Sequence, residues 1–373
     1  MKWNSYRHNL SRRWIFIGLL CLLSAIQITP VAAQTSIVTN GTDPSSHLPY
    51  FELHNSAWNL VGAAVDATGS RVAVGLENGD IHIYSNAFEL LDTLSGHTAA
   101  IGALDWSPDG TRLASNSLDS SVKVWNVVIG ALLATLSPHY AVPIAITWSP
   151  DGSQLAISSY TVQTWDSGAP VYNSAGNPIT DGMLELWDMT TFSRLQASPT
   201  LRMIGVTLSW NPEGTQILIP VWGVNRIWDI RTAQFTQQIP SLWFNILTAQ
   251  WSPTGEHIAY GMVGDPTSDA LIPVNMVVVD LASGRSVAIE AAANNVSGLT
   301  WHTNGAWLAW SDLGSKDFYL LHVPTSTRIV VTGHSDYLRQ LFWSGDGSHL
   351  VSTSIDGTVR IWDTTTLVEP PEP

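Results

Sequence analysis

Apolar runs separated by turn residues fill most of the chain, and residues 333–363 are their clearest copy. In this copy the apolar run 338–343 ends in Ser-Gly-Asp-Gly, the run 350–354 is followed by Asp-Gly, and a third run covers 359–362. Glycine accepts positive φ and aspartate bonds its own backbone, so both endings predict turns. Asp-Gly between apolar runs is typical of a β-hairpin. The stretch therefore predicts three antiparallel strands, which need neighbours of the same kind to bury both faces.

The turn after the first strand recurs as a pentad of residues that ends in glycine. In every copy the second strand then begins with two consecutive apolar residues, as expected for a strand buried on both faces. Such a period indicates a repeat protein in which each unit buries its neighbour. The pattern predicts an all-β chain of seven units. The pentads begin at Val65, Trp106, Trp148, Trp210, Trp251, Trp301 and Trp343.

The ends of the third strands connect this pattern to a known family. Four of them end in Trp-Asp or Trp-Asn, at Trp125, Trp187, Trp228 and Trp362. With a period of about 40 to 45 residues, the chain resembles the WD-repeat β-propellers over residues 48–363. The resemblance implies a single seven-bladed propeller of four-stranded blades, which we place at residues 48–367. We expect the N-terminal segment around Phe51 to supply the outer strand of blade seven and close the ring.

The resemblance also implies a hydrogen-bonded set in each complete repeat: a histidine, a hydroxyl residue of the second strand, the hairpin aspartate and the tryptophan. The second repeat offers His97, Ser115 or Ser117, Asp119 and Trp125, and the seventh offers His334, Ser352 or Ser354, Asp356 and Trp362. The third repeat keeps His139, Asp181 and Trp187. In the fourth repeat Trp222 takes the aspartate position, and Leu242 and Ala292 take the histidine position in the fifth and sixth. We expect the incomplete blades to be held mainly by apolar packing.

Two repeats are longer than the others, the third at about 160–182 and the fifth at about 263–273. Both insertions lie between the second and third strands, whose loops share a face of a propeller with the blade-to-blade loops. Insertions in repeat proteins often mark the binding face. Aromatic residues expected on this face are Trp58, Tyr140, Trp165, Trp222, Trp243 and Tyr337. They predict a recognition surface for a protein or peptide, although each ring could instead pack between blades beneath its own loop.

The first 33 residues have the pattern of a secretory signal peptide. Basic residues precede an apolar run at 14–28, and small residues at 31–33 form a cleavage site, so we place cleavage after Ala33. An uncleaved anchor is the alternative, but the run is short for a membrane span. Residues 34–47 are predicted to be a linker and residues 368–373 an unstructured tail. The signal predicts an exported protein, secreted or periplasmic. The single cysteine, Cys21, lies within the signal, so the cleaved chain would have none, and we expect a bacterial cell.

Charge and composition argue against several classes of partner and of chemistry. The formal net charge of −14 argues against nucleic acid and anionic lipid as partners, and we expect no stable membrane insertion after cleavage. No His-Glu-x-x-His or cysteine pair predicts a metal site, so no metal or cofactor is expected. The His-Ser-Asp set has the composition of a catalytic triad, yet a triad is recognised by geometry. We expect a non-enzymatic binding scaffold; the alternative is an exported hydrolase or lactonase-like enzyme working at the mouth of the central channel.

Overall fold

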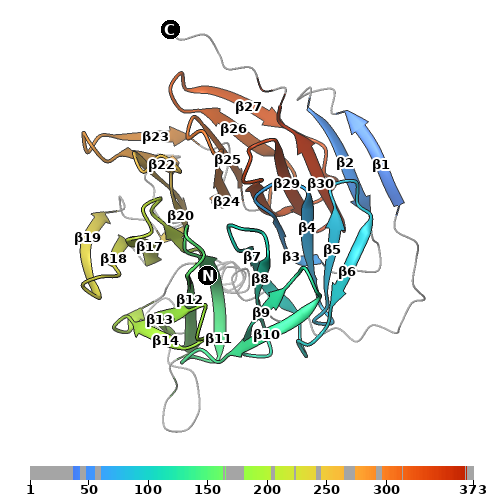
Figure 1. The fold of residues 1–373 in the computed structure, drawn as a ribbon. Coiled ribbons are helices and arrows are strands. Elements are labelled where there is room, and N and C mark those ends of the chain that lie inside the picture. Colours follow the sequence, from blue (N-terminus) through green and yellow to red (C-terminus); the bar gives the residue numbers. More distant parts are fainter. Residues whose placement is uncertain are drawn as a thin grey trace, which may run out of the picture.

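The propeller is the dominant feature of the described part of the chain. The computed structural model describes residues 37–42, 48–54, 60–162, 164, 180–202, 206–221, 224–240, 245–263, 274–290, 296–312, 314–365 and 367. These residues form strands and no helices, and the strands build seven antiparallel sheets. The sheets stand around a common centre as the blades of one ring (Figure 1). The predicted seven-bladed, all-β fold is confirmed.

Each blade runs from an inner strand near the centre to an outer strand at the perimeter. Blade 1 contains β3 (Leu60–Val65), β4 (Arg71–Leu76), β5 (Ile81–Ser85) and β6 (Leu90–Leu94); blade 2 contains β7 (Ile101–Trp106), β8 (Arg112–Ser117), β9 (Val122–Asn126) and β10 (Ala131–Leu136). Blade 3 contains β11 (Val142–Trp148), β12 (Gln154–Val162), β13 (Thr180–Asp188) and β14 (Arg194–Ala197), with β15 (Leu201–Arg202) also paired to β13. Blade 4 contains β16 (Ser209–Trp210), β17 (Gln216–Val221), β18 (Val224–Asp229) and β19 (Gln234–Pro240).

The remaining three blades complete the ring. Blade 5 contains β20 (Asn245–Trp251), β21 (His257–Val263), β22 (Val274–Asp280) and β23 (Ser286–Glu290); blade 6 contains β24 (Val296–Trp301), β25 (Trp307–Asp312), β26 (Phe318–His322) and β27 (Thr327–Val331). Blade 7 contains β28 (Leu338–Trp343), β29 (His349–Ser354) and β30 (Thr358–Asp363), followed outward by β2 (Pro49–His54) and β1 (Ile37–Thr42).

The ring is closed by the N-terminal strand β2, as predicted. β2 pairs antiparallel with β30, and Phe51 lies opposite Ile361. Arg360 Nε donates to Glu52 Oε2 at 2.7 Å, and the Arg360 guanidinium lies 4.4 Å from the Tyr50 ring centroid. Both ends of the propeller are therefore joined in one sheet by backbone and side-chain contacts.

Part of the segment expected to be a linker is a strand. Within 34–47, residues Ile37–Thr42 form β1, which pairs with β2 along its whole length and gives blade 7 a fifth strand. An edge strand carries unpaired N–H and C=O groups that pair with an extended neighbour, and composition alone did not reveal this. The expected signal at 1–33 and the tail at 368–373 lie outside the described residues.

The pentad glycines have the backbone conformation, and the second strands the burial, that their sequences predict. The pentad glycine has φ between 65° and 74° in all seven copies, for example 67° at Gly110, and only glycine adopts this conformation without a steric cost. The apolar pairs of the second strands are fully buried, with Leu113, Leu155 and Leu350 all 0% exposed. The core consists of apolar clusters shared by neighbouring blades, so each blade depends on the next for burial.

Candidate interaction face

The polar set of blade 2 joins the blade-to-blade loop to the two middle strands. His97 Nδ1 lies 2.8 Å from Asp119 Oδ2, and His97 Nε2 lies 2.8 Å from Ser115 Oγ. Trp125 Nε1 donates to the same Ser115 Oγ at 2.9 Å. Ser115, not Ser117, is therefore the hydroxyl member; Ser117 Oγ instead donates to a loop carbonyl.

The protonation state of this set follows from its surroundings. Burial lowers the pKa of His97 and outweighs the opposing effect of the Asp119 carboxylate. Burial would raise the pKa of Asp119, but hydrogen bonds from Ser121, His97 and the Thr98 backbone lower it to about 2. A neutral imidazole thus donates from Nδ1 to a charged carboxylate and accepts the Ser115 hydroxyl proton at Nε2.

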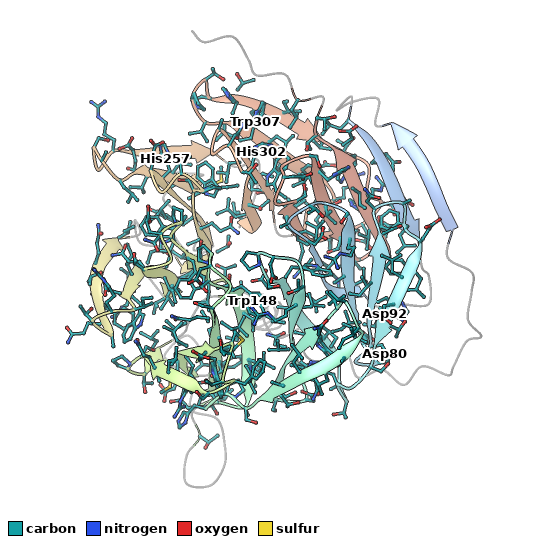
Figure 2. All side chains as sticks on the ribbon, in the orientation of Figure 1. Asp80, Asp92, Trp148, His257, His302 and Trp307 are labelled. Atoms are coloured by element: carbon teal, nitrogen blue, oxygen red, sulfur yellow. The ribbon has the colours of Figure 1, made fainter. Side chains whose placement is uncertain are left out.

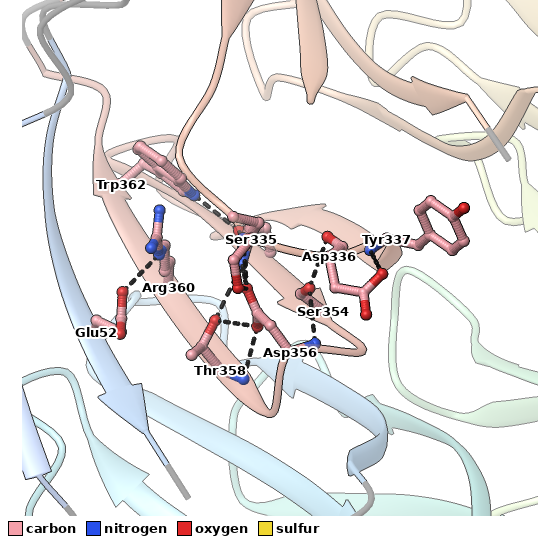
Figure 3. Close-up of polar contacts among 11 residues, drawn as sticks. Glu52, Ser335, Asp336, Tyr337, Ser354, Asp356, Thr358, Arg360 and Trp362 are labelled. Atoms are coloured by element: carbon pink, nitrogen blue, oxygen red, sulfur yellow. Dashed lines mark hydrogen bonds and ion pairs between the residues drawn. The ribbon is translucent and has the colours of Figure 1, made fainter. Parts of the chain in front are cut away.

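Blade 7 repeats the arrangement (Figure 3). His334 Nε2 lies 2.7 Å from Ser352 Oγ, and Trp362 Nε1 donates to that oxygen at 2.8 Å. His334 Nδ1 lies 3.2 Å from Asp356 Oδ2 and 3.0 Å from Thr358 Oγ1. Burial lowers the pKa of His334, and hydrogen bonds from His334 and Thr358 hold that of Asp356 far below its usual range against the effect of burial.

Both sets fix loops and leave no access for a substrate. Ser115 and Ser352 are 0% exposed, and each oxygen is already occupied by an indole N–H. Their connectivity resembles a Ser-His-Asp triad. The nucleophile of such a triad must contact its substrate, and these buried serine oxygens have no room for one. On the surface side, Asp119 accepts from the backbone N–H of Thr98 at 3.0 Å, which ties the hairpin to the blade-to-blade loop.

We define the hairpin face by three exposed apolar side chains beside these two sets, Leu118, Tyr337 and Ile355. They are 36%, 52% and 49% exposed, respectively. The Ile355 N–H donates to the Tyr337 carbonyl at 2.8 Å, so these two residues are held side by side in blade 7. Between blades 7 and 2, the blade 1 hairpin lies against the loop of blade 2, because a Cβ on Gly79 would lie 2.6 Å from the His97 carbonyl oxygen.

The predicted aromatic surface can be placed only in part. Tyr337 is exposed on the hairpin face, whereas Tyr140 is half-buried with its ring centroid 4.9 Å from that of His139. The other predicted aromatic residues, Trp58, Trp165, Trp222 and Trp243, lie outside the described residues. Sequence reasoning missed Leu118 and Ile355, although each directly precedes a hairpin aspartate that it had identified.

The third repeat, which has the histidine, aspartate and tryptophan positions of the set, does not assemble it. His139 is exposed, and its backbone N–H donates to Glu185 Oε2 at 3.0 Å. Trp187 Nε1 is buried without a hydrogen-bond partner. The reason is the strand position of Ser115, which in blade 3 is held by Ile157. Because Ile157 has no hydroxyl group, the histidine and the indole of this repeat have no common hydrogen-bond partner.

The insertion of the third repeat begins as regular strand. Tyr160 pairs with Gly182 and Val162 with Thr180, so the hairpin of β12 and β13 extends into the segment predicted to be extra loop. Each of these strands has nine residues. The middle of this insertion and most of the one in the fifth repeat lie outside the described residues.

Blade 6 replaces the polar set with stacked rings. Trp310 occupies the Ser115 position, is 0% exposed, and stacks on Tyr319 with centroids 5.0 Å apart. The Arg328 guanidinium lies 4.3 Å from the Tyr319 centroid. Apolar packing and a cation–π contact thus hold this blade.

Two further expectations concern metals and membranes. Among the described residues, no group of three or more His, Cys, Asp or Glu side chains could hold a metal ion. Within the same residues, no helix is long and apolar enough to cross a membrane.

The ring of seven radial sheets defines the protein as a seven-bladed β-propeller. Two segments match the family model "WD domain, G-beta repeat", residues 88–126 and 325–363. Each segment includes one of the two complete polar sets, so these two repeats are the ones that match the WD40 family model. The match coincides with the blades that the sequence predicted to be complete.

Curated relatives share short segments with the chain. Periodic tryptophan protein 2 of Saccharomyces cerevisiae is 41% identical over 66 residues, which is 17% of this chain and 7% of that protein. Actin-interacting protein 1 of Caenorhabditis elegans is 53% identical over 45 residues, 12% of this chain and 7% of that protein. Retinoblastoma-binding protein homolog 5 of the same species is 33% identical over 85 residues, 22% of this chain and 18% of that protein. The chain thus matches less than a fifth of each, and all three are eukaryotic, which gives the expected bacterial source no support.

Proposed function

We propose that this propeller is a non-enzymatic scaffold that binds a protein or peptide on its hairpin face. The observation that carries the proposal is the pair Tyr337 and Ile355, which are exposed on the blade-to-blade loop and the hairpin of blade 7. A buried hydrogen-bonded set ties these two segments together. A surface that is already ordered loses little conformational entropy on binding. Tyrosine is also enriched among residues that dominate binding energy.

The relatives support the same class of function. The printed names of two of them, an actin-interacting protein and a retinoblastoma-binding protein homolog, refer to protein partners. The net charge of −14 favours a partner with basic character over nucleic acid or an anionic membrane. We extend the proposed surface to Trp58, Trp165 and Trp243, which the sequence predicts on the same face.

The test measures affinity for a purified partner first recovered with the wild-type protein. We expect the double variant Tyr337→Ala, Ile355→Ala to bind at least about tenfold more weakly, and the triple alanine variant at Trp58, Trp165 and Trp243 also to lose affinity. The matched control is Val330→Ala, an exposed apolar residue of the outer strand β27. Unchanged affinity in both multiple variants, with folding intact, would reject the hairpin face as the binding surface.

We also propose that the protein is exported and cleaved after Ala33. The support is the order of basic, apolar and small residues in the first 33 positions. Mass spectrometry of the protein isolated from the exported fraction should give an N-terminus at Gln34. A chain that retains residues 1–33 in that fraction would contradict cleavage.

A further inference from the structure

A second apolar surface lies on the perimeter of blades 1 and 2, away from the hairpin face. It consists of two leucine pairs on the outer strands β6 and β10 and two aliphatic residues in the turn before β10. The six side chains, with their exposed fractions, are Leu90 (54%), Leu91 (53%), Val128 (70%), Ile129 (72%), Leu132 (45%) and Leu133 (39%). We call these six residues the outer patch.

The leucine pairs are exposed because both outer strands contain a bulge. The pairing of β6 with β5 passes from Leu90 to Asp92 and skips Leu91. The pairing of β10 with β9 passes from Leu132 to Ala134 and skips Leu133. A bulge re-aims a side chain that would otherwise alternate between the faces, so two adjacent leucines are exposed in each strand.

The turn of blade 2 is apolar where the turn of blade 3 is polar. Val128 and Ile129 precede Gly130, whose φ is 64°, and the residues before the equivalent Phe192 of blade 3 are both threonine. The turn conformation therefore does not require aliphatic side chains. A Cβ on Gly130 would lie 2.7 Å from Asp92 Oδ2, so this turn lies against β6 and makes the patch continuous between the blades. Figure 2 labels Asp92 on the outer part of blade 1.

Among the described strands, β10 has an open edge for pairing. It is the outermost strand of its sheet, and its sequence Ala-Leu-Leu-Ala-Thr-Leu contains no charged residue or proline of the kind that protects edges. Blade 7 shows what such an edge accepts, since its outer strand β2 carries β1 as an additional antiparallel strand. An extended segment can therefore add to an outer strand of this propeller without disturbing the ring.

The acidic residues beside the outer patch favour one kind of binding partner over another. Residues 85–95 and 126–137 contain Glu89 and Asp92 but no lysine or arginine. The neighbouring Lys123 of β9 donates from Nζ to Thr135 Oγ1 at 3.0 Å. A second copy of the chain would bring the same acidic residues and another net charge of −14 to the contact. An apolar strand flanked by basic residues would instead meet opposite charge.

We propose that the outer patch binds an extended apolar segment of a partner protein, flanked by Lys or Arg, which adds to the free edge of β10. Backbone pairing along the edge supplies affinity, and the exposed leucines together with Val128 and Ile129 supply contacts for alternate side chains. Glu89 and Asp92 favour the basic flanks. This site is independent of the hairpin face, so loss of either one leaves the other intact.

The probe is a labelled peptide, Lys-Lys-Val-Thr-Ile-Val-Thr-Lys-Lys, titrated with the full-length protein and followed by fluorescence anisotropy. The variant Val128→Thr, Ile129→Thr, Leu132→Thr, Leu133→Thr keeps β-branched residues in the turn and places strand-favouring β-branched residues in β10. We expect it to bind the peptide at least about tenfold more weakly than wild type. The matched control is Leu195→Thr, an equally exposed leucine at the bulge of β14 in blade 3, which should bind as wild type.

Two altered peptides separate the elements of the proposal. Replacing every Lys with Glu should weaken binding at least about tenfold if the acidic residues select the flanks, and N-methylation of alternate backbone amides should abolish binding if the strand pairs with β10. Equal binding of wild type and the fourfold variant, or no binding of the Lys-flanked peptide by wild type, would overturn the proposal. So would sedimentation of wild type as a dimer that the fourfold variant converts to a monomer, because the occupant would then be a second copy.

Discussion

Blades 6 and 7 are neighbours that fill the same strand position with different chemistry. In blade 7, Ser352 accepts from an indole and contacts a buried imidazole, whereas in blade 6 Trp310 fills that position with its own rings. Trp310 Nε1 is buried without a hydrogen-bond partner, so blade 6 relies on volume and stacking. The hydrogen-bonded set of blade 7 also secures a loop, because Asp356 accepts from the Ser335 backbone at 2.9 Å.

Comparing the two blades shows which contacts a blade needs to fold and which contacts hold a surface loop in place. In both blades the three inner strands follow one another in chain order. The second strand is buried throughout in blade 6 and buried except for its first residue, His349, in blade 7. Of the two, blade 7 connects its interior to the hairpin face through charged and neutral hydrogen bonds, as the contacts of His334 and Asp356 show. Apolar packing is therefore sufficient for a blade, and the polar set adds a fixed loop.

The largest expected effect comes from removing the rings of blade 6. Trp310→Ala should lower the free energy of unfolding by about 3 to 5 kcal/mol, because it leaves a cavity and removes the partner of Tyr319. Urea unfolding followed by circular dichroism measures the change. Trp310→Phe, which retains a ring, should lose clearly less; equal losses would show that stacking is not what holds this blade.

Breaking the set of blade 7 should cost somewhat less. His334→Ala leaves Asp356 and Ser352 without their shared partner, and we expect a loss of about 2 to 3 kcal/mol. The control His139→Ala removes an exposed histidine and should change stability by less than about 0.5 kcal/mol. Hydrogen exchange should show faster opening of the blade 7 hairpin in His334→Ala and no change there in Trp310→Ala. Similar exchange in both variants would contradict the division of roles between the two blades.

The polar sets should also make stability depend on pH. Burial lowers the pKa values of His97 and His334 in the folded protein, so below the unfolded value of about 6.5 the unfolded chain binds more protons. Their contribution is complete above that pH and declines as the pH falls, by up to about 1.4 kcal/mol per pH unit for each histidine. Unfolding free energies between pH 7 and 5 should fall less steeply in a double variant His97→Gln, His334→Gln. An unchanged slope would show that other groups are responsible.

The smallest effect is expected at the edge of the ring stack. Arg328→Ala removes the guanidinium over Tyr319, and at a partly exposed site this contact is worth about 0.5 to 1 kcal/mol. Arg328→Met retains much of the aliphatic packing and serves as the comparison in the same urea experiment. If both variants lose the same amount, the charge contributes and the packing does not.

The fold could be predicted because its signal is repeated. Seven glycine-terminated pentads in register leave few architectures open, and Phe51 could be assigned to the closing strand by position alone. The members of the polar set were harder: Ser115 and Ser117 are equivalent in composition and both point to the same face of the strand, so only the indole of Trp125 decides between them. In blade 3 a histidine and a tryptophan were present, but Ile157 removed the hydroxyl group that joins them.

The surfaces were less predictable for a different reason. Aromatic residues could be assigned to loops, but exposure depends on neighbouring blades, as Tyr140 and Tyr337 show. The outer patch was missed because a bulge changes the alternation that sequence reasoning assumes, and no residue type marks the bulge at Leu91 or Leu133.

The closing sheet joins two strands that are synthesised at very different times. Glu52 and Arg360, which form an ion pair across this sheet, are 308 residues apart in the chain. At about 5 to 20 residues per second, roughly 15 to 60 s pass between the synthesis of the two residues. During that interval β2 has left the ribosome without the strand that it will cover, and the growing blades form an open arc. The edge of β2 that will pair with β30 therefore stays open while the intervening blades are made, and the last blade of the ring is the one that covers it.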